Sequence, residues 1–125
     1  MKNIPEISRT EFEILRVLWR ISEASVREVH DNLSSGISWA YSTTKTTMDR
    51  MVKKGLLDRS DFHGVFVYSA LVTRPQGLFR WVKFIADRVL ETDYIEVVAL
   101  FAKNKKLNSE EIDELTNLLE KEINE

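Results

Sequence analysis

The sequence predicts a mainly α-helical fold with one small β-hairpin, and three patterns along its 125 residues indicate this class. Apolar residues recur at helical spacing in three short segments of the first half. The period changes to two between residues 56 and 70, which is typical of paired strands. From residue 74 the helical period returns and continues towards the C-terminus. We therefore expect three helices, a hairpin and a second helical region, in that order.

Two capping boxes mark where the first two helices begin. In this motif a serine and a glutamate three residues later satisfy each other's backbone N–H groups. Ser8 and Ser25 each begin such a motif, and apolar residues at helical spacing follow both of them. We expect a first helix over about residues 9–20 and a second, shorter helix that ends near Ser34.

The segment 42–55 predicts a third helix with a divided surface. Met48, Met51 and Val52 stand three and four residues apart, so they share one face of the helix. Thr44 lies one turn earlier on the same face, which should be buried. The opposite face carries hydroxyl and cationic side chains, which can meet the phosphates and base edges of DNA. It consists of Thr43, Lys45, Thr46, Thr47 and Arg50.

Alternating residues in 56–59 and 65–70 predict two strands, with residues 60–64 as the turn between them. Three helices followed by a hairpin, with a basic and hydroxyl-rich third helix, is the element order of a winged helix-turn-helix domain. The hairpin would be the wing, and the DNA-binding domain would span residues 1–72.

Residues 73–125 predict three more amphipathic helices without a sheet, which we interpret as a helical dimerisation arm. Asn108 with Glu111 forms a third capping box at the start of the last of these helices. A large apolar surface is seldom left exposed on a monomer, so we expect a second copy of the chain to cover it. The residues expected at that contact are Phe79, Val82, Ile85, Val98, Phe101, Ile112, Leu115 and Leu119.

The chain has a net charge of −2, but the segment 42–59 is locally basic, with five cations against two acids. This balance indicates binding to DNA. The alternative is a solvated helix whose cations gather near its C-terminal end, where the helix dipole favours them. The cations are Lys45, Arg50, Lys53, Lys54 and Arg59, and the acids are Asp49 and Asp58.

Several function classes are excluded by what the sequence lacks. It has no cysteine, so disulfides, thiolate metal sites and cysteine nucleophiles are absent. Its two histidines, His30 and His63, fall on different elements, so we expect no metal site. The absence of a phosphate-binding glycine loop and of a catalytic triad motif indicates a protein that is not an enzyme and needs no cofactor. With no apolar run of the ~18 residues that span a membrane and no signal peptide, we expect a cytoplasmic protein without membrane insertion.

Trp39 and Tyr41 precede the third helix and allow two interpretations. Aromatic side chains at such a position can stack on nucleic acid. We favour the simpler interpretation that they anchor the turn into the helix, since buried tryptophan and tyrosine usually find a hydrogen-bond partner.

Taken in order, these segments resemble the penicillinase-repressor family of winged-helix regulators, the BlaI/MecI type with its copper-responsive CopY relatives. The resemblance covers nearly the whole chain. Residues 7–19 and 25–29 resemble the family's first two helices. Residues 43–57 resemble its recognition helix and the turn after it, and residues 67–69 resemble the second strand of its wing.

The resemblance implies a homodimeric transcriptional repressor that binds a palindromic operator in double-stranded DNA through paired recognition helices. Lys45 and Arg50 are our candidates for base contacts, and Lys53, Lys54 and Arg59 for positions near phosphates. The positions that match the family's DNA-contacting helix are Ser42, Thr43, Lys45, Thr46, Thr47 and Arg50.

Two release mechanisms of the family do not match this chain in full. In its antibiotic-responsive members a membrane sensor protease triggers cleavage at an Asn-Phe bond. Phe101 matches the Phe, but Leu100 stands in the place of Asn. CopY-like members hold metal through a Cys-rich C-terminal motif, and this chain has no Cys.

Two other functions fit the same order of elements. A winged-helix module of this kind could dock an acidic protein partner through its third helix, without specific binding to DNA. A winged-helix regulator could also respond to a small molecule bound between the winged domain and the arm.

Overall fold

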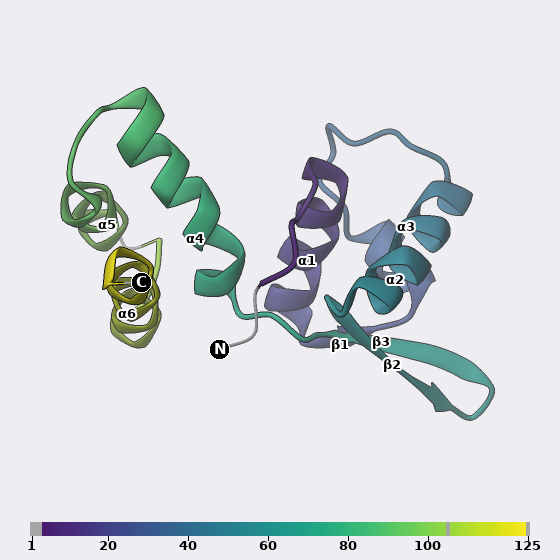
Figure 1. Ribbon diagram of the computed structural model, residues 1–125. Helices are drawn as coiled ribbons and strands as arrows, with labels where there is room; N and C mark the ends of the chain where they lie inside the picture. Colours follow the sequence, from purple (N-terminus) through teal and green to yellow (C-terminus); the bar gives the residue numbers. More distant parts are fainter. Residues whose placement is uncertain (1–3, 105, 125) are drawn as a thin grey trace. The chain divides into compact units, whose positions relative to one another are not determined.

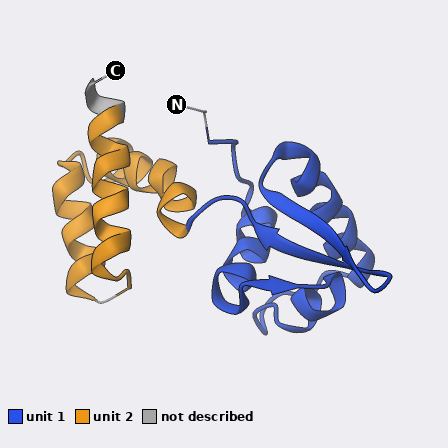
Figure 2. Ribbon diagram, turned by 90° about the horizontal axis from the view of Figure 1, so that it is seen from below, with its two compact units in different colours: residues 1–73 blue, residues 74–125 orange. Residues whose placement is uncertain are grey.

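The structure, a computed structural model, describes residues 4–104 and 106–124. The chain divides into two compact units, Met1–Thr73 and Arg74–Glu125 (Figure 2). Each unit has its own buried residues.

The first unit contains three helices and three strands in the predicted order, with one added strand (Figure 1). The first helix and the third lie within a residue or two of the predicted bounds. The elements are α1 (Arg9–Ile21), β1 (Glu23–Ala24), α2 (Val26–Asp31), α3 (Tyr41–Lys54), β2 (Leu57–Phe62) and β3 (Val65–Ala70).

The second helix is shorter than predicted, because it ends at Asp31 rather than near Ser34. Asn32 follows it and donates its side-chain Nδ2 to the carbonyl oxygen of Glu28 at 2.8 Å. The same carbonyl oxygen accepts the Asn32 backbone N–H at 3.2 Å, so the asparagine caps the helix with both its backbone and its side chain.

The predicted turn of the hairpin was too long. Strand β2 continues to Phe62, and the turn consists of His63 and Gly64 only. Both residues have positive φ angles, 52° and 84°, which match the type I′ turn that suits the twist of a two-residue hairpin. The side chain of Asp61 stabilises the turn by accepting the Gly64 N–H at 2.8 Å.

The sheet has three antiparallel strands in the order β1-β3-β2. Strand β1 was not predicted, because two residues are too few to show an alternating pattern. Its Ala24 pairs with Tyr68 of β3, and both side chains are buried. The two longer strands extend beyond the helices as a ribbon, which is the wing (Figure 1).

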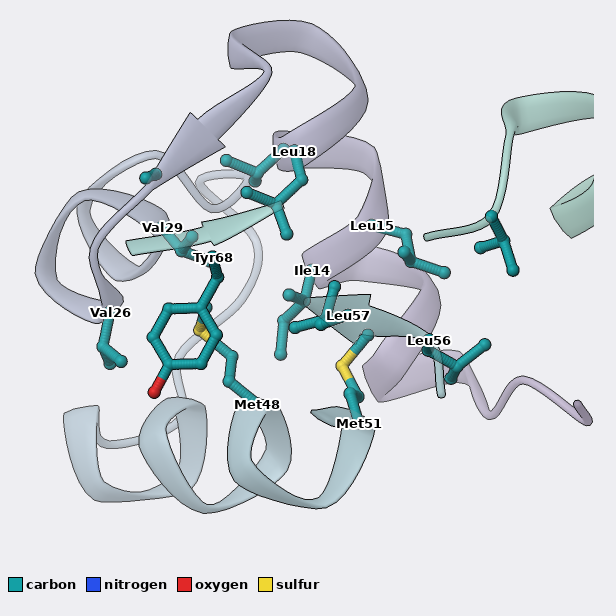
Figure 3. Packing of buried hydrophobic residues seen from close by; sticks show 13 residues of the cluster. Ile14, Leu15, Leu18, Val26, Val29, Met48, Met51, Leu56, Leu57 and Tyr68 are labelled. Atoms are coloured by element: carbon teal, nitrogen blue, oxygen red, sulfur yellow. The ribbon is translucent and has the colours of Figure 1, made fainter. Parts of the chain in front are cut away.

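The core of the first unit is built from all three helices and the bases of the strands (Figure 3). Met48 and Met51 are fully buried and point from α3 into this cluster, as predicted. Trp19 lies at its edge and donates its indole N–H to the carbonyl oxygen of Val72 at 2.9 Å. The core therefore fixes which face of α3 remains on the surface.

In the part of the second unit that the structure describes, every regular element is a helix. The helix that begins at Arg74 changes to a π-helical turn after Phe84, and this turn ends before Leu90. The last helix begins with the predicted capping box, since Asn108 Oδ1 accepts the Glu111 N–H at 2.8 Å. The elements are α4 (Arg74–Phe84), η1 (Ile85–Val89), α5 (Tyr94–Lys103) and α6 (Ser109–Asn124).

Candidate nucleic-acid interface

The exposed face of α3 carries most of the polar side chains that the sequence placed there. Thr47 is the exception, because only 3% of it is exposed. It lies three residues after Thr44 and four before Met51, so it belongs to the buried stripe of the helix. The same spacing was visible in the sequence, and the expectation that Thr47 faces outward was wrong. The exposed residues are Ser42, Thr43, Lys45, Thr46 and Arg50.

A buried hydroxyl fixes the N-terminal end of α3. The Oγ1 atom of Thr44, which is fully buried, accepts the indole N–H of Trp39 at 2.7 Å. The same oxygen lies 2.8 Å from Nδ1 of His30 in α2. Trp39 therefore anchors the turn into α3, as the sequence predicted.

Tyr41, the first residue of α3, lies between two side chains of α2. Its ring makes an edge contact with His30, with 5.6 Å between the ring centroids. The guanidinium carbon of Arg27 lies 4.1 Å from the centroid of the Tyr41 ring, a cation–π contact. These contacts hold α2 and the start of α3 together.

Asp49 connects the exposed face of α3 to the wing. Its carboxylate lies 3.2 Å from Nζ of Lys45, one turn earlier, and 3.5 Å from NH1 of Arg59 in β2. The hydroxyl of Tyr68 in β3 donates to the same carboxylate at 3.3 Å. Burial raises the pKa of the Tyr68 phenol, and the nearby charge of Asp49 adds to this, so the phenol remains a neutral donor. The sequence showed Asp49 only as a charge that offsets the cations.

Arg59 makes a second contact within the wing. Its guanidinium carbon lies 4.4 Å from the centroid of the Phe66 ring in β3. The two residues face the same side of the hairpin as Tyr68, the cross-strand partner of Arg59. The cation is thus held between the recognition helix and the exposed part of the wing.

Glu11 in α1 contacts the cationic face of α3, which its place in a capping box did not indicate. Only 1% of it is exposed, and its carboxylate meets two cations of α3. Nζ of Lys54 lies 2.8 Å from Oε1, and Nε of Arg50 lies 3.3 Å from Oε2. Burial alone would raise the pKa of Glu11, but hydrogen bonds from Lys54 and Ser8 and the charge of Lys54 outweigh it, so the pKa lies below its ordinary value.

The five cations proposed for DNA contact differ in how many contacts they make within the protein and in how much of each side chain is exposed. Lys54 is the most engaged, because it also donates to the carbonyl oxygen of Glu6 at 2.7 Å and its side chain is only 33% exposed. Lys45 and Arg50 keep 60% and 52% of their side chains exposed. Lys53 is exposed as well.

The residues expected at a dimer contact are mostly used inside the second unit itself. Phe79, Val82, Val98, Leu115 and Leu119 are buried among its own helices. In this structure they form the core of the unit, so the expectation that they present a surface to a partner is corrected. Ile85, Phe101 and Ile112 are partly exposed. Among the residues of this unit whose burial is described, the exposed large apolar ones are Trp81, Phe84, Val89, Leu90, Ile95 and Leu100.

Across the described residues, no three His, Asp or Glu side chains come together in a way that could hold a metal ion. His30 contacts Thr44 and Tyr41, whereas His63 forms the turn of the wing. None of the described helices is long and apolar enough to cross a membrane.

Residues 7–121 match the sequence profile of the family described as penicillinase repressor. The chain belongs to this family. The penicillinase repressor of Bacillus licheniformis is 32% identical over 124 residues, covering 99% of this chain and 97% of the relative. The methicillin resistance regulatory protein MecI of Staphylococcus aureus (strain N315) is 28% identical over 116 residues, or 93% of this chain and 94% of the relative.

Two solved structures are similar to part of this chain. The solution structure of the DNA-binding domain of the repressor BlaI matches with a TM-score of 0.52 and 36% identity, covering 61% of this chain and 93% of that domain. The solution structure of monomeric BlaI from Bacillus licheniformis in complex with the blaP half-operator gives the same four values. These matches confirm the predicted winged-helix fold of a DNA-binding domain followed by helices.

Membership in the penicillinase repressor family settles the broad class. The chain is a transcriptional repressor of the winged-helix type, and it is not an enzyme. The prediction from sequence was right on both points.

Proposed function

We propose that the chain represses transcription as a cytoplasmic homodimer that binds a palindromic operator through two copies of α3. The observation that carries the proposal is the divided surface of α3. Its apolar face is fixed in the core, and its outer face presents Lys45, Thr46 and Arg50 to solvent. The similar BlaI domain was solved with the blaP half-operator, which supports this use of the first unit.

The exposed side chains of α3 divide into two roles in this proposal. Lys45 and Arg50 contact base edges in the major groove, since long cations form the commonest specific pairs with guanine. Lys53, Lys54 and Arg59 lie near phosphates, which position the protein without reading sequence. Ser42, Thr43 and Thr46 supply hydroxyl groups near the start of the helix. Thr47 is left out, because it is buried.

The second unit holds the two copies together in this proposal. Its exposed apolar residues are too many to be left in water without a partner. Trp81 and Phe84 stand three residues apart near the end of α4, so they share one face of that helix. A symmetric dimer would set the spacing of the two half-sites at ~10 bp or a multiple of it, centre to centre.

We do not propose that cleavage between Leu100 and Phe101 releases the repressor from DNA. Both residues lie inside α5, so a protease would have to unfold this helix to reach the bond between them. Leu100 also differs from the residue that precedes the cleaved bond in the family.

Selection of binding sites from fragmented genomic DNA tests the proposal. The purified chain and its Lys45→Ala/Arg50→Ala variant would be compared at two salt concentrations. We expect the wild type to enrich a two-fold symmetric site and the variant to lose it. Binding that depends only on charge would weaken steeply with salt in both proteins and would enrich no site. That result would favour docking of an acidic protein partner over operator binding.

A further inference from the structure

We propose that Glu11 is a positioning residue for DNA recognition, which holds the Arg50 guanidinium by Nε so that its two terminal nitrogens can donate to a base edge. This inference rests on the proposed operator binding. It adds a residue that does not touch DNA, because Glu11 is buried in α1 with 1% exposed.

The geometry of the contact leaves the recognition end of Arg50 available. Oε2 of Glu11 lies 3.3 Å from Nε, the nitrogen nearest the aliphatic stem of the side chain. A guanidinium has five N–H groups in a fixed plane, and the fork formed by the terminal nitrogens is the part that pairs with guanine. The Arg50 side chain is 52% exposed, although one of its nitrogens is held by a buried carboxylate.

The carboxylate is itself fixed by other groups. Its Oε1 accepts the Ser8 N–H at 2.9 Å as part of the capping box of α1, and the Lys54 ammonium at 2.8 Å. A buried acceptor with two further partners has little freedom to move. It therefore reduces the number of rotamers that Arg50 explores before binding, and preorganisation of this kind increases affinity for the matching site.

The charge of Glu11 acts in the opposite direction on random DNA. A buried negative charge beside two cations of α3 weakens their attraction to phosphates, which provides nearly all of non-specific binding. Because attraction to phosphates also contributes to binding at the selected site, this charge effect acts on both duplexes, and the positioning of Arg50 is what should strengthen binding to the selected site relative to random DNA. The quantity to measure is the specificity ratio, the dissociation constant for a scrambled duplex divided by that for the selected site.

A matched control exists in α2. Glu28 forms the same capping box with Ser25, with its Oε1 accepting the Ser25 N–H at 3.0 Å. Glu28 is exposed, and its carboxylate contacts its own capping box rather than α3. The Glu28→Gln variant therefore reports what a weakened capping box does without any effect on Arg50.

The test is a double-mutant cycle of Glu11→Gln with Arg50→Ala, with the folded fraction of each variant monitored by circular dichroism. We expect Glu11→Gln to lower the specificity ratio about ten-fold when Arg50 is present, and less than two-fold in the Arg50→Ala background. The Glu28→Gln control should leave the ratio unchanged. An unchanged ratio for Glu11→Gln, or equal losses in both backgrounds, would overturn the inference.

Two further variants keep the inference open to refutation. If Lys54→Gln lowers the ratio as much as Glu11→Gln does, then Glu11 acts through Lys54 and the assignment to Arg50 is wrong. If the Glu11→Gln variant does not fold, the Arg50→Lys variant still tests whether Glu11 positions Arg50. A lysine keeps the charge, but it has neither the Nε–H that Glu11 holds nor the planar fork of terminal nitrogens, so a retained ratio would refute positioning through Nε.

The wild-type specificity ratio separates a wrong role for Glu11 from a wrong proposed function. If the wild type shows a ratio near one, the proposed function itself is wrong. If the wild-type ratio is high and Glu11→Gln leaves it unchanged, only the role of Glu11 is lost.

Discussion

Arg59 in the wing lies 3.5 Å from Asp49 in the recognition helix, measured from NH1 to Oδ1. The two residues are ten positions apart and belong to different elements, β2 and α3. Tyr68 of β3 joins the same carboxylate. The relationship means that the position of the wing relative to α3 is set by polar contacts as well as by the apolar core.

Asp49→Asn should loosen this connection and change the DNA preference of the chain. The pair is partly exposed, so we expect the free energy of unfolding to fall by about 1 kcal/mol or less. The loss of a negative charge beside Lys45 and Arg59 should raise the affinity for random duplexes. Urea unfolding and fluorescence anisotropy would measure the two effects. Asp58→Asn, an exposed acid in β2, is the control, and equal changes in both variants would show that charge alone matters.

Thr44→Val should destabilise the first unit by about 1–3 kcal/mol, because the change keeps the shape of the side chain but leaves partly buried groups without their partner. The groups affected are the indole N–H of Trp39 and Nδ1 of His30. Thermal or urea unfolding would measure the loss. Thr46→Val, an exposed position on the same helix, should change stability by no more than ~0.5 kcal/mol. Similar losses at both positions would contradict the role given to Thr44.

Phe84→Glu should weaken self-association. Phe84 is 54% exposed at the end of α4, three residues after Trp81, which is 42% exposed. Burial of a phenylalanine side chain is worth about 1.5–3 kcal/mol, so its loss should raise the dimer dissociation constant about ten-fold or more. Sedimentation velocity over a concentration series would measure this change. Phe62→Glu is the control, since Phe62 is 65% exposed on the wing. A wild type that stays monomeric at all concentrations would refute dimerisation.

The lowered pKa of Glu11 predicts how stability depends on pH. Its pKa in the folded chain lies below the ordinary value of 4.5, so its contribution is fully present above that pH. The contribution is lost as the pH falls through the lower, folded-state value. We therefore expect the stability difference between wild type and Glu11→Gln to be constant near neutral pH and to shrink below pH 4.5. Urea unfolding at several pH values would measure it, and a difference that stays constant below that pH would contradict the role given to the Glu11 charge.

Local signals were sufficient to predict most of the fold. The two capping boxes at Ser8 and Ser25 marked helix starts correctly, because the motif depends only on residues three positions apart. The turn of the hairpin was placed too widely, because a histidine at positive φ gives a weak signal beside Gly64. Strand β1 exists only through its pairing with β3, a contact between residues far apart in the chain.

The candidate site was predicted only in part, for a similar reason. Helical spacing located the exposed face of α3, and the same spacing applied to Thr47 would have placed it in the buried stripe. The contacts of Glu11 with Arg50 and Lys54 join residues 39 and 43 positions apart, and no sequence pattern indicates them. The dimer residues were misplaced because periodicity shows that a face is apolar but not what covers it.

The most direct test of operator binding is the specificity ratio of the wild type, measured by fluorescence anisotropy at physiological salt. The two duplexes would be the site selected from genomic DNA and a scrambled sequence of the same composition. We expect a ratio of at least about 10³ for the wild type, typical of a specific regulator, and a ratio near one for Lys45→Ala/Arg50→Ala. A wild-type ratio near one, or a ratio that the double variant leaves intact, would contradict recognition through the exposed face of α3.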